Sequence, residues 1–191
     1  MVDRVLFVCH ANLCRSPMAE YIARRLLADQ PVVVGSAGTD AHDDLAMHPY
    51  AAEVAAGTGA DPRLFRSRRL RPEHLAGATL VLTATRRQRS VCTALAPAAL
   101  HRTFTLRQFG RLAEAAGAAP DAAEPARGGT AGPLRAAVEA AARARGRLQP
   151  AAPDADDLPD PLGGSAADFR RCAEEIERVM RPLAVLIGTA G

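Results

Sequence analysis

A cysteine and an arginine lie six residues apart in the stretch Cys-His-Ala-Asn-Leu-Cys-Arg-Ser-Pro, residues 9–17. The apolar run Val5–Val8, typical of a buried strand, precedes this stretch, and a helical pattern, Met18–Leu27, follows it. A turn between a strand and a helix directs main-chain N–H groups at an anion, because the first helical turn has unpaired donors and the positive end of the dipole. Cys9, near that helix end and Arg15, should be largely thiolate near neutral pH. The sequence thus predicts a nucleophile that attacks phosphorus and forms a phosphocysteine.

Each position of this loop has an expected role. Cys9 is the nucleophile, in preference to a small buried hydrophobic residue. Arg15 should bind two phosphate oxygens through its planar guanidinium, in preference to forming a surface ion pair. Ser16 is expected to cap the helix, with Pro17 at the first helical position. Main-chain N–H groups should supply further charge stabilisation, so the expected phosphate-binding set is His10, Ala11, Asn12, Leu13, Cys14 and Arg15.

The motif Val8-Cys9-x-x-Asn12-x-Cys14-Arg15-Ser16-Pro17-Met18-Ala19-Glu20 resembles the signature of the low-molecular-weight protein tyrosine phosphatases. A second family element, Pro159-Asp160-Pro161, precedes a glycine pair and a helix. The resemblance covers residues 3–109 and 157–187. It implies that the Ser16 hydroxyl hydrogen-bonds the thiolate and helps it leave, and that Asn12 braces the loop through its side chain.

The resemblance also implies a general acid, Asp160. This residue must hold a proton near neutral pH, through burial or the nearby phosphate, to donate it to the leaving group. The same carboxylate would then activate the water that hydrolyses phosphocysteine. Asp156 and Asp157 are neighbours of the same type, and an exposed acidic turn is the alternative interpretation of the segment.

The other cysteines have less specific surroundings. By resemblance, Cys14 forms a reversible disulfide that protects Cys9 from over-oxidation; a loop-packing role stays equally open. Cys92 and Cys172 are expected in the core. The four cysteines and five histidines lack metal-ligand spacing, and no Gly-x-Gly-x-x-Gly or Walker loop follows a strand. We therefore expect no metal, no cofactor and no nucleotide-binding Rossmann domain.

The sequence departs from the family at the substrate pocket. The position after Asp-Pro, usually aromatic in the family, is Leu162, and the chain contains no tryptophan. The pocket walls would come from His10, Leu13, His42 or Leu162, which leaves phosphotyrosine and related phosphate esters both open. The pair Gly163-Gly164 resembles the bacterial branch that includes protein arginine phosphatases. Those proteins carry threonine where this chain has Leu13, which disfavours phosphoarginine.

Two other functions stay open. An arsenate reductase would use the same thiolate loop with electrons from further thiols. A multi-cysteine version needs a close pair after the third expected strand, where this chain offers Cys92 alone, and a version that uses an external thiol stays open. A weakly active phospho-binding regulatory module would bind phosphopeptides without turnover. Hydrolysis of phosphate esters, arsenate-dependent thiol oxidation and tight binding without hydrolysis distinguish the three.

The fold that positions these residues follows from four apolar runs separated by helical segments. This order predicts a flavodoxin-like, doubly wound α/β domain with a four-stranded parallel sheet, helices on both faces, and the site at the carboxyl ends of the strands. The second run should turn at Ser36–Thr39, a helix should span Arg86–Leu95, and Pro182 should kink or end the last helix. The expected strands are Val5–Val8, Pro31–Gly35, Thr79–Thr83 and Thr103–Leu106.

Residues 1–191 should form a single domain with an Ala/Gly/Pro/Arg-rich insertion at about 111–156. We expect this insertion to be a partly helical surface elaboration, in preference to a partner-binding arm. A formal charge of only +3 with scattered arginines argues against nucleic-acid binding. No apolar run suits a membrane span or a signal peptide, so we expect a cytoplasmic protein. The expected partner is a phosphorylated protein or a small phosphate ester. The oligomeric state stays open.

Overall fold

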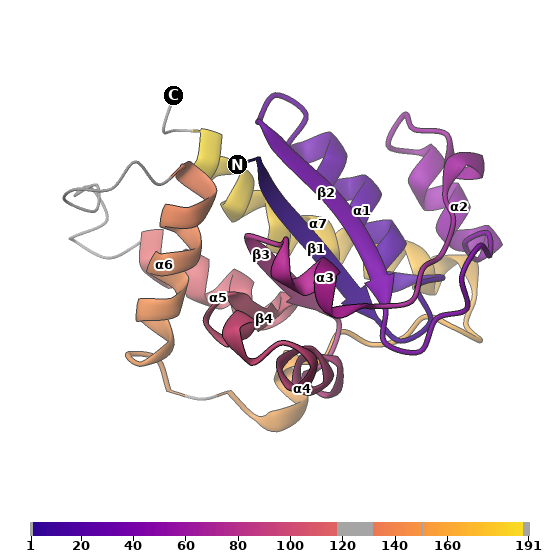
Figure 1. Ribbon diagram of the computed structural model, residues 1–191. Coiled ribbons are helices and arrows are strands. Elements are labelled where there is room, and N and C mark those ends of the chain that lie inside the picture. Colours follow the sequence, from indigo (N-terminus) through magenta and orange to yellow (C-terminus); the bar gives the residue numbers. More distant parts are fainter. Residues whose placement is uncertain (1, 118–131, 150, 189–191) are drawn as a thin grey trace.

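The computed structural model describes residues 2–117, 132–149 and 151–188. Its centre is one parallel sheet with the strand order β2-β1-β3-β4 (Figure 1), which confirms the expected α/β architecture. In chain order the strands are β1 (Asp3–Cys9), β2 (Val32–Gly38), β3 (Leu80–Thr83) and β4 (Thr103–Thr105).

Helices cover both faces of the sheet, as the sequence predicts. Because side chains alternate along a strand, Val5 and Phe7 of β1 face one core while Leu6 and Val8 face the other. The larger core packs against α1 (Arg15–Leu26), α2 (Pro49–Ala56), α5 (Leu106–Gly117), α6 (Pro133–Arg145) and α7 (Ala166–Gly188). The smaller core packs against α3 (Pro72–Ala76) and α4 (Arg86–Leu95). Within the described residues, the short 3-10 segments η1 (Pro62–Leu64), η2 (Pro97–Arg102) and η4 (Pro153–Asp156) connect these elements.

Several local expectations are wrong at element ends. β2 does not turn at Ser36 but continues to Gly38, which pairs with Cys9 of β1. β2 is an edge strand, and Val33 on it is 47% exposed. β4 ends one residue before Leu106, which starts α5. Of the two outcomes expected at Pro182, a kink or a helix end, the end is wrong: α7 continues through Pro182 to Gly188.

The region expected as an insertion contributes to the core. Residues 111–117 continue α5, and the buried face of α6 joins the larger core. The expectation of a surface elaboration is therefore wrong for α6; the single-domain assignment stays a prediction. No helix within the described residues is long and apolar enough to cross a membrane.

Candidate active site

The cysteine loop connects β1 to α1 at the carboxyl end of the sheet. Cys9 is the last residue of β1, and its Sγ accepts a hydrogen bond from the main-chain N–H of Asn12 at 3.3 Å. The Ser16 Oγ lies 3.0 Å from the same sulfur. In the described part of the chain, no residue accepts a hydrogen bond from the main-chain N–H groups of Ala11, Leu13 or Cys14. These donors therefore stay available to an anion that enters the loop.

Ser16 does not cap the helix, contrary to the sequence expectation. α1 begins at Arg15 with Cys14 at the N-cap position, and no side chain caps it, so Pro17 lies at the third helical position. The Ser16 hydroxyl instead lies between the Cys9 sulfur, the Asn12 amide and the carbonyl of Ala37. A polar group beside the sulfur can stabilise its anionic form by hydrogen bonding.

Asn12 holds the loop through its side chain. Its backbone is left-handed, with φ of 56°, and the residue is fully buried. Its Nδ2 donates at 2.8 Å to the hydroxyls of both Ser16 and Ser36, and its Oδ1 accepts from the main-chain N–H of Arg68 at 2.9 Å. Asn12 therefore links α1, β2 and the segment that follows η1, and the loop cannot change shape without breaking these bonds.

A second set of polar residues, which the sequence analysis missed, supports Asn12 from behind. The Ser36 hydroxyl donates to Glu20 Oε2 at 2.6 Å, and Glu20 forms an ion pair with Arg24. Arg68 Nε donates to the Ser36 carbonyl at 2.6 Å. Burial raises the pKa of Glu20 above its ordinary value, since desolvation disfavours the carboxylate.

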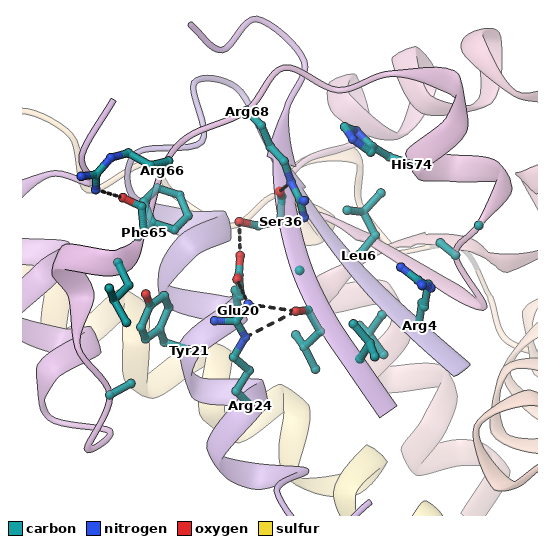
Figure 2. A pocket seen from close by; sticks show the side chains of 18 of the residues that line it. Arg4, Leu6, Glu20, Tyr21, Arg24, Ser36, Phe65, Arg66, Arg68 and His74 are labelled. Carbon is teal, nitrogen blue, oxygen red and sulfur yellow. Dashed lines mark hydrogen bonds and ion pairs between the residues drawn. The ribbon is translucent and has the colours of Figure 1, made fainter. Parts of the chain in front are cut away.

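Figure 2 shows these side chains around a cavity of about 630 Å³ between α1, the edge strand β2 and α3. Cys9, Arg15 and Asp160 do not line this cavity, so it lies behind the loop and does not form its mouth. The Ser-Ala-Gly-Thr segment at residues 36–39 was the available sequence signal for Ser36.

Gly38 permits close approach between β2 and the loop. A Cβ atom at this position would lie 2.4 Å from the His10 carbonyl oxygen and 2.8 Å from the Asn12 nitrogen. The next main-chain N–H groups, of Thr39 and Asp40, each donate at 3.0 Å to the carbonyls of Cys9 and His10. The end of β2 thus fixes the start of the loop through main-chain contacts.

Arg15 and Asp160 meet across the site although 145 residues separate them. Arg15 Nη2 forms an ion pair with Asp160 Oδ2, and Arg15 Nη1 donates to the Leu158 carbonyl at 3.2 Å. Asp160 also accepts from the main-chain N–H of Leu162 at 3.2 Å. The Arg15 Nε is buried and has no hydrogen-bond partner among the described residues. A phosphate group in the loop would satisfy this donor and compete for Nη2.

The two neighbouring aspartates point elsewhere. Asp156 pairs with Arg86 and Arg111, and Asp157 accepts from the main-chain N–H of Arg86 at 2.7 Å. Of the three carboxylates that the sequence leaves as candidates, only Asp160 reaches the cysteine loop.

The other cysteines are buried and remain free thiols. Burial raises the pKa of Cys14 to about 12, and nearby Asp160 and Cys9 act in the same direction. Burial likewise raises the pKa values of Cys92 and Cys172 to about 12. All three therefore stay protonated near neutral pH and react slowly as nucleophiles. Within the described ranges, no group of three or more His, Cys, Asp or Glu side chains could hold a metal ion.

The residues expected to wall the pocket differ in exposure. Leu162 is 61% exposed, His10 and His42 are exposed, and Leu13 is partly buried. His10 Nε2 lies 3.8 Å from Asp40 Oδ2. An aromatic pair that the sequence analysis did not consider lies next to Leu13. His48 donates its main-chain N–H to the Leu13 carbonyl at 2.9 Å, and the His48 ring stacks on Phe169.

A buried thiol at the end of a strand, a guanidinium on the following helix and unpaired amides between them form a cysteine loop that could hold an anion such as phosphate. The family model for low molecular weight phosphotyrosine protein phosphatases matches residues 4–149, more than half of the chain. The chain belongs to this family of cysteine-dependent phosphatases.

Its relatives include phosphatases of two specificities. A protein-arginine-phosphatase from Geobacillus stearothermophilus is 37% identical over 109 residues, 57% of this chain and 72% of the relative. A probable low molecular weight protein-tyrosine-phosphatase, EpsP, from Ralstonia nicotianae is 33% identical over 106 residues, 56% of this chain and 72% of the relative. The solved structure of the YwlE arginine phosphatase from G. stearothermophilus matches with a TM-score of 0.68 at 27% identity, over 98% of this chain and 94% of that chain.

Proposed function

We propose that this protein hydrolyses phosphotyrosine, or a related phosphate ester, through a phosphocysteine intermediate. The observation that carries the proposal is the convergence of Cys9, Arg15 and Asp160 at one end of the sheet. The family match ends before Asp160, so the assignment of the acid depends on this geometry and on the resemblance of the Asp-Pro turn. We also propose that the protein acts in the cytoplasm, where thiols stay reduced.

The first step transfers the phosphoryl group to sulfur. A bound phosphate dianion takes over the Arg15 guanidinium and displaces the Asp160 carboxylate from its ion pair. The freed carboxyl group can then serve the leaving oxygen as the proposed general acid. Cys9 then attacks phosphorus, the P–S bond forms as the ester P–O bond breaks, and Asp160 gives its proton to the departing oxygen.

The second step returns the enzyme to its starting state. Asp160, now a carboxylate, removes a proton from a water molecule whose oxygen attacks phosphorus. The P–S bond breaks and the sulfur leaves as a thiolate beside the Ser16 hydroxyl and the Asn12 N–H. Arg15 and the free loop amides hold the equatorial oxygens in both transition states.

Phosphoarginine is the second candidate substrate, because a relative that shares 37% identity is named as an arginine phosphatase. Leu13 still disfavours it: this side chain offers no hydroxyl where that branch carries threonine. An arsenate reductase has less support, since Cys92 and Cys172 are buried thiols with pKa values of about 12, poorly suited to relay electrons as thiolates.

A side-by-side assay tests the proposal. Purified protein is given phenyl phosphate, a phosphotyrosine peptide, phosphoarginine and arsenate with dithiothreitol, and turnover is measured for each. Cys9→Ser should abolish hydrolysis, and Asp160→Asn should slow it about 10²–10⁴-fold. Turnover of phosphoarginine alone, of arsenate alone, or tight phosphopeptide binding without turnover would each replace the proposed function with the corresponding alternative.

A further inference from the structure

The segment from η4 to Asp160 places the proposed acid beside Arg15, but the side chain of Asp160 makes few contacts of its own there. Its side chain is 43% exposed, and it makes one ion pair and accepts one main-chain N–H. Substrate must break that ion pair before the acid can work. Other contacts must therefore keep Asp160 in place during catalysis.

Asp156 supplies such a contact four residues earlier. Its side chain is 3% exposed, and it lies between two arginines from different elements: Arg111 of α5 and Arg86 of α4. Arg111 Nη2 both donates a hydrogen bond to and forms an ion pair with Asp156 Oδ1, while Arg86 Nε lies 3.5 Å from Oδ2. A buried carboxylate is stable only when it is paired and hydrogen-bonded, so this arrangement fixes the position of Asp156.

The contacts continue from Asp156 towards the acid. Asp157 accepts from the main-chain N–H of Arg86 at 2.7 Å, so Arg86 holds two successive residues of the segment. The main-chain N–H of Leu158 donates to the Ala84 carbonyl at 2.8 Å, and its own carbonyl accepts from Arg15. Contacts at three successive residues, Asp156, Asp157 and Leu158, therefore connect the Asp156 carboxylate to the catalytic arginine.

We propose that Asp156, through Arg111 and Arg86, is a positioning residue that holds the acid loop over the phosphate site. This inference depends on the proposed function, because it assigns Asp156 a role only if Asp160 is the general acid. Loss of the ion pairs between Asp156 and the two arginines would leave Cys9 and Arg15 in place but allow Asp160 to move away from the phosphate site. A displacement of about 1 Å in a catalytic group can lower the rate on the order of 10²-fold.

The leaving group of the substrate separates this role from a purely structural one. Phenyl phosphate has a poor leaving group that needs a proton from the acid, whereas 2,4-dinitrophenyl phosphate leaves without one. The ratio of kcat/KM for the two esters therefore measures the acid alone, because kcat/KM reports formation of the P–S bond.

The variants are Asp156→Asn and Arg111→Gln, with Asp154→Asn as the matched control. Asp154 lies in the same segment and is exposed, and its side chain forms no hydrogen bond or ion pair among the described residues. Both test variants should lower kcat/KM at least about tenfold for phenyl phosphate and less than about twofold for dinitrophenyl phosphate. Asp154→Asn should change neither. Arg111 is 41% exposed, so its variant should fold even if Asp156→Asn does not, and near-UV circular dichroism checks both.

The outcomes separate the positioning role of Asp156 from the assignment of Asp160 as the general acid. If Asp160→Asn shows the leaving-group effect but Asp156→Asn and Arg111→Gln slow both esters equally or not at all, Asp156 does not position the acid. If Asp160→Asn itself shows no leaving-group effect, the acid has been assigned wrongly and the proposed mechanism fails first.

Discussion

Replacement of Asn12 tests whether its side chain holds the cysteine loop in shape. Asn12 makes three side-chain hydrogen bonds: buried ones to Ser16 and Ser36, and a partly buried one to the main chain of Arg68. Each such bond contributes about 1 kcal/mol net. Its left-handed backbone adds a second effect, because a Cβ-bearing residue without a local polar group costs about 1–2 kcal/mol there.

These contributions predict different losses for two substitutions. Asn12→Ala should lower the free energy of unfolding by about 4 kcal/mol, three from the bonds and one from the backbone. Asn12→Gly removes the same bonds but tolerates the left-handed backbone, so it should lose about 3 kcal/mol. Both should lower phenyl phosphate hydrolysis. The main-chain N–H that donates to the Cys9 sulfur belongs to this residue, and its position depends on the side-chain bonds that both variants lose.

Urea unfolding at 25 °C measures both losses, with Asp44→Ala as the control. Asp44 is the other non-glycine residue with positive φ, at 66°, in the described ranges, and it is exposed, so its replacement should cost only the backbone contribution of about 1 kcal/mol. A loss below about 1 kcal/mol for Asn12→Ala, with activity retained, would refute the reasoning.

Three further predictions concern neighbouring residues. Gly38→Ala should lower hydrolysis at least about tenfold, because its Cβ would meet main-chain atoms of the cysteine loop, whereas Gly146→Ala, whose nearest contact is at 3.9 Å, should leave the rate unchanged; equal rates in a steady-state assay would contradict this. Burial raises the pKa of Glu20, so the folded state binds its proton more tightly than the unfolded state does. The free energy of unfolding should therefore fall as pH rises from the ordinary glutamate pKa of 4.5 towards the raised value. Glu20→Gln should flatten this pH dependence in urea unfolding, and an unchanged slope would count against the prediction. Cys14, with its pKa raised to about 12, should be alkylated by iodoacetamide near pH 7.5 more slowly than a free cysteine; equal rates by mass spectrometry would argue that it is not buried as a thiol.

Elements whose signals are local could be predicted well from the sequence. α4 was expected at Arg86–Leu95 and begins and ends there; Thr85 fixes its start by accepting from the main-chain N–H of Gln88. The apolar run of β2 was visible, but its extension to Gly38 depends on pairing with Cys9 of another strand, which no local pattern encodes. Element types were therefore predictable, while their ends depended on distant partners.

The same distinction applies to the candidate site. The loop residues follow one another in the sequence, so their spacing alone indicated a phosphate cradle. Serine is a residue type that often caps helices, but the Ser16 hydroxyl is hydrogen-bonded to the Cys9 sulfur and the side-chain amide of Asn12 instead. Asp156 looked like one of three similar aspartates, because the arginines that pair with it come from α4 and α5. Local rules cannot reveal a role that depends on residues 45 or more positions away.

The distance along the chain between Cys9 and Asp160 has a consequence during synthesis. A ribosome releases the N-terminal part of a chain first, and domains begin to fold from that end. The thiol loop therefore emerges long before the segment that carries the carboxyl group and before α7, which packs against α1. A partly made chain can present the sulfur but not Asp160, so if Asp160 is the acid proposed above, hydrolysis of esters with poor leaving groups should begin only when the later segment has docked.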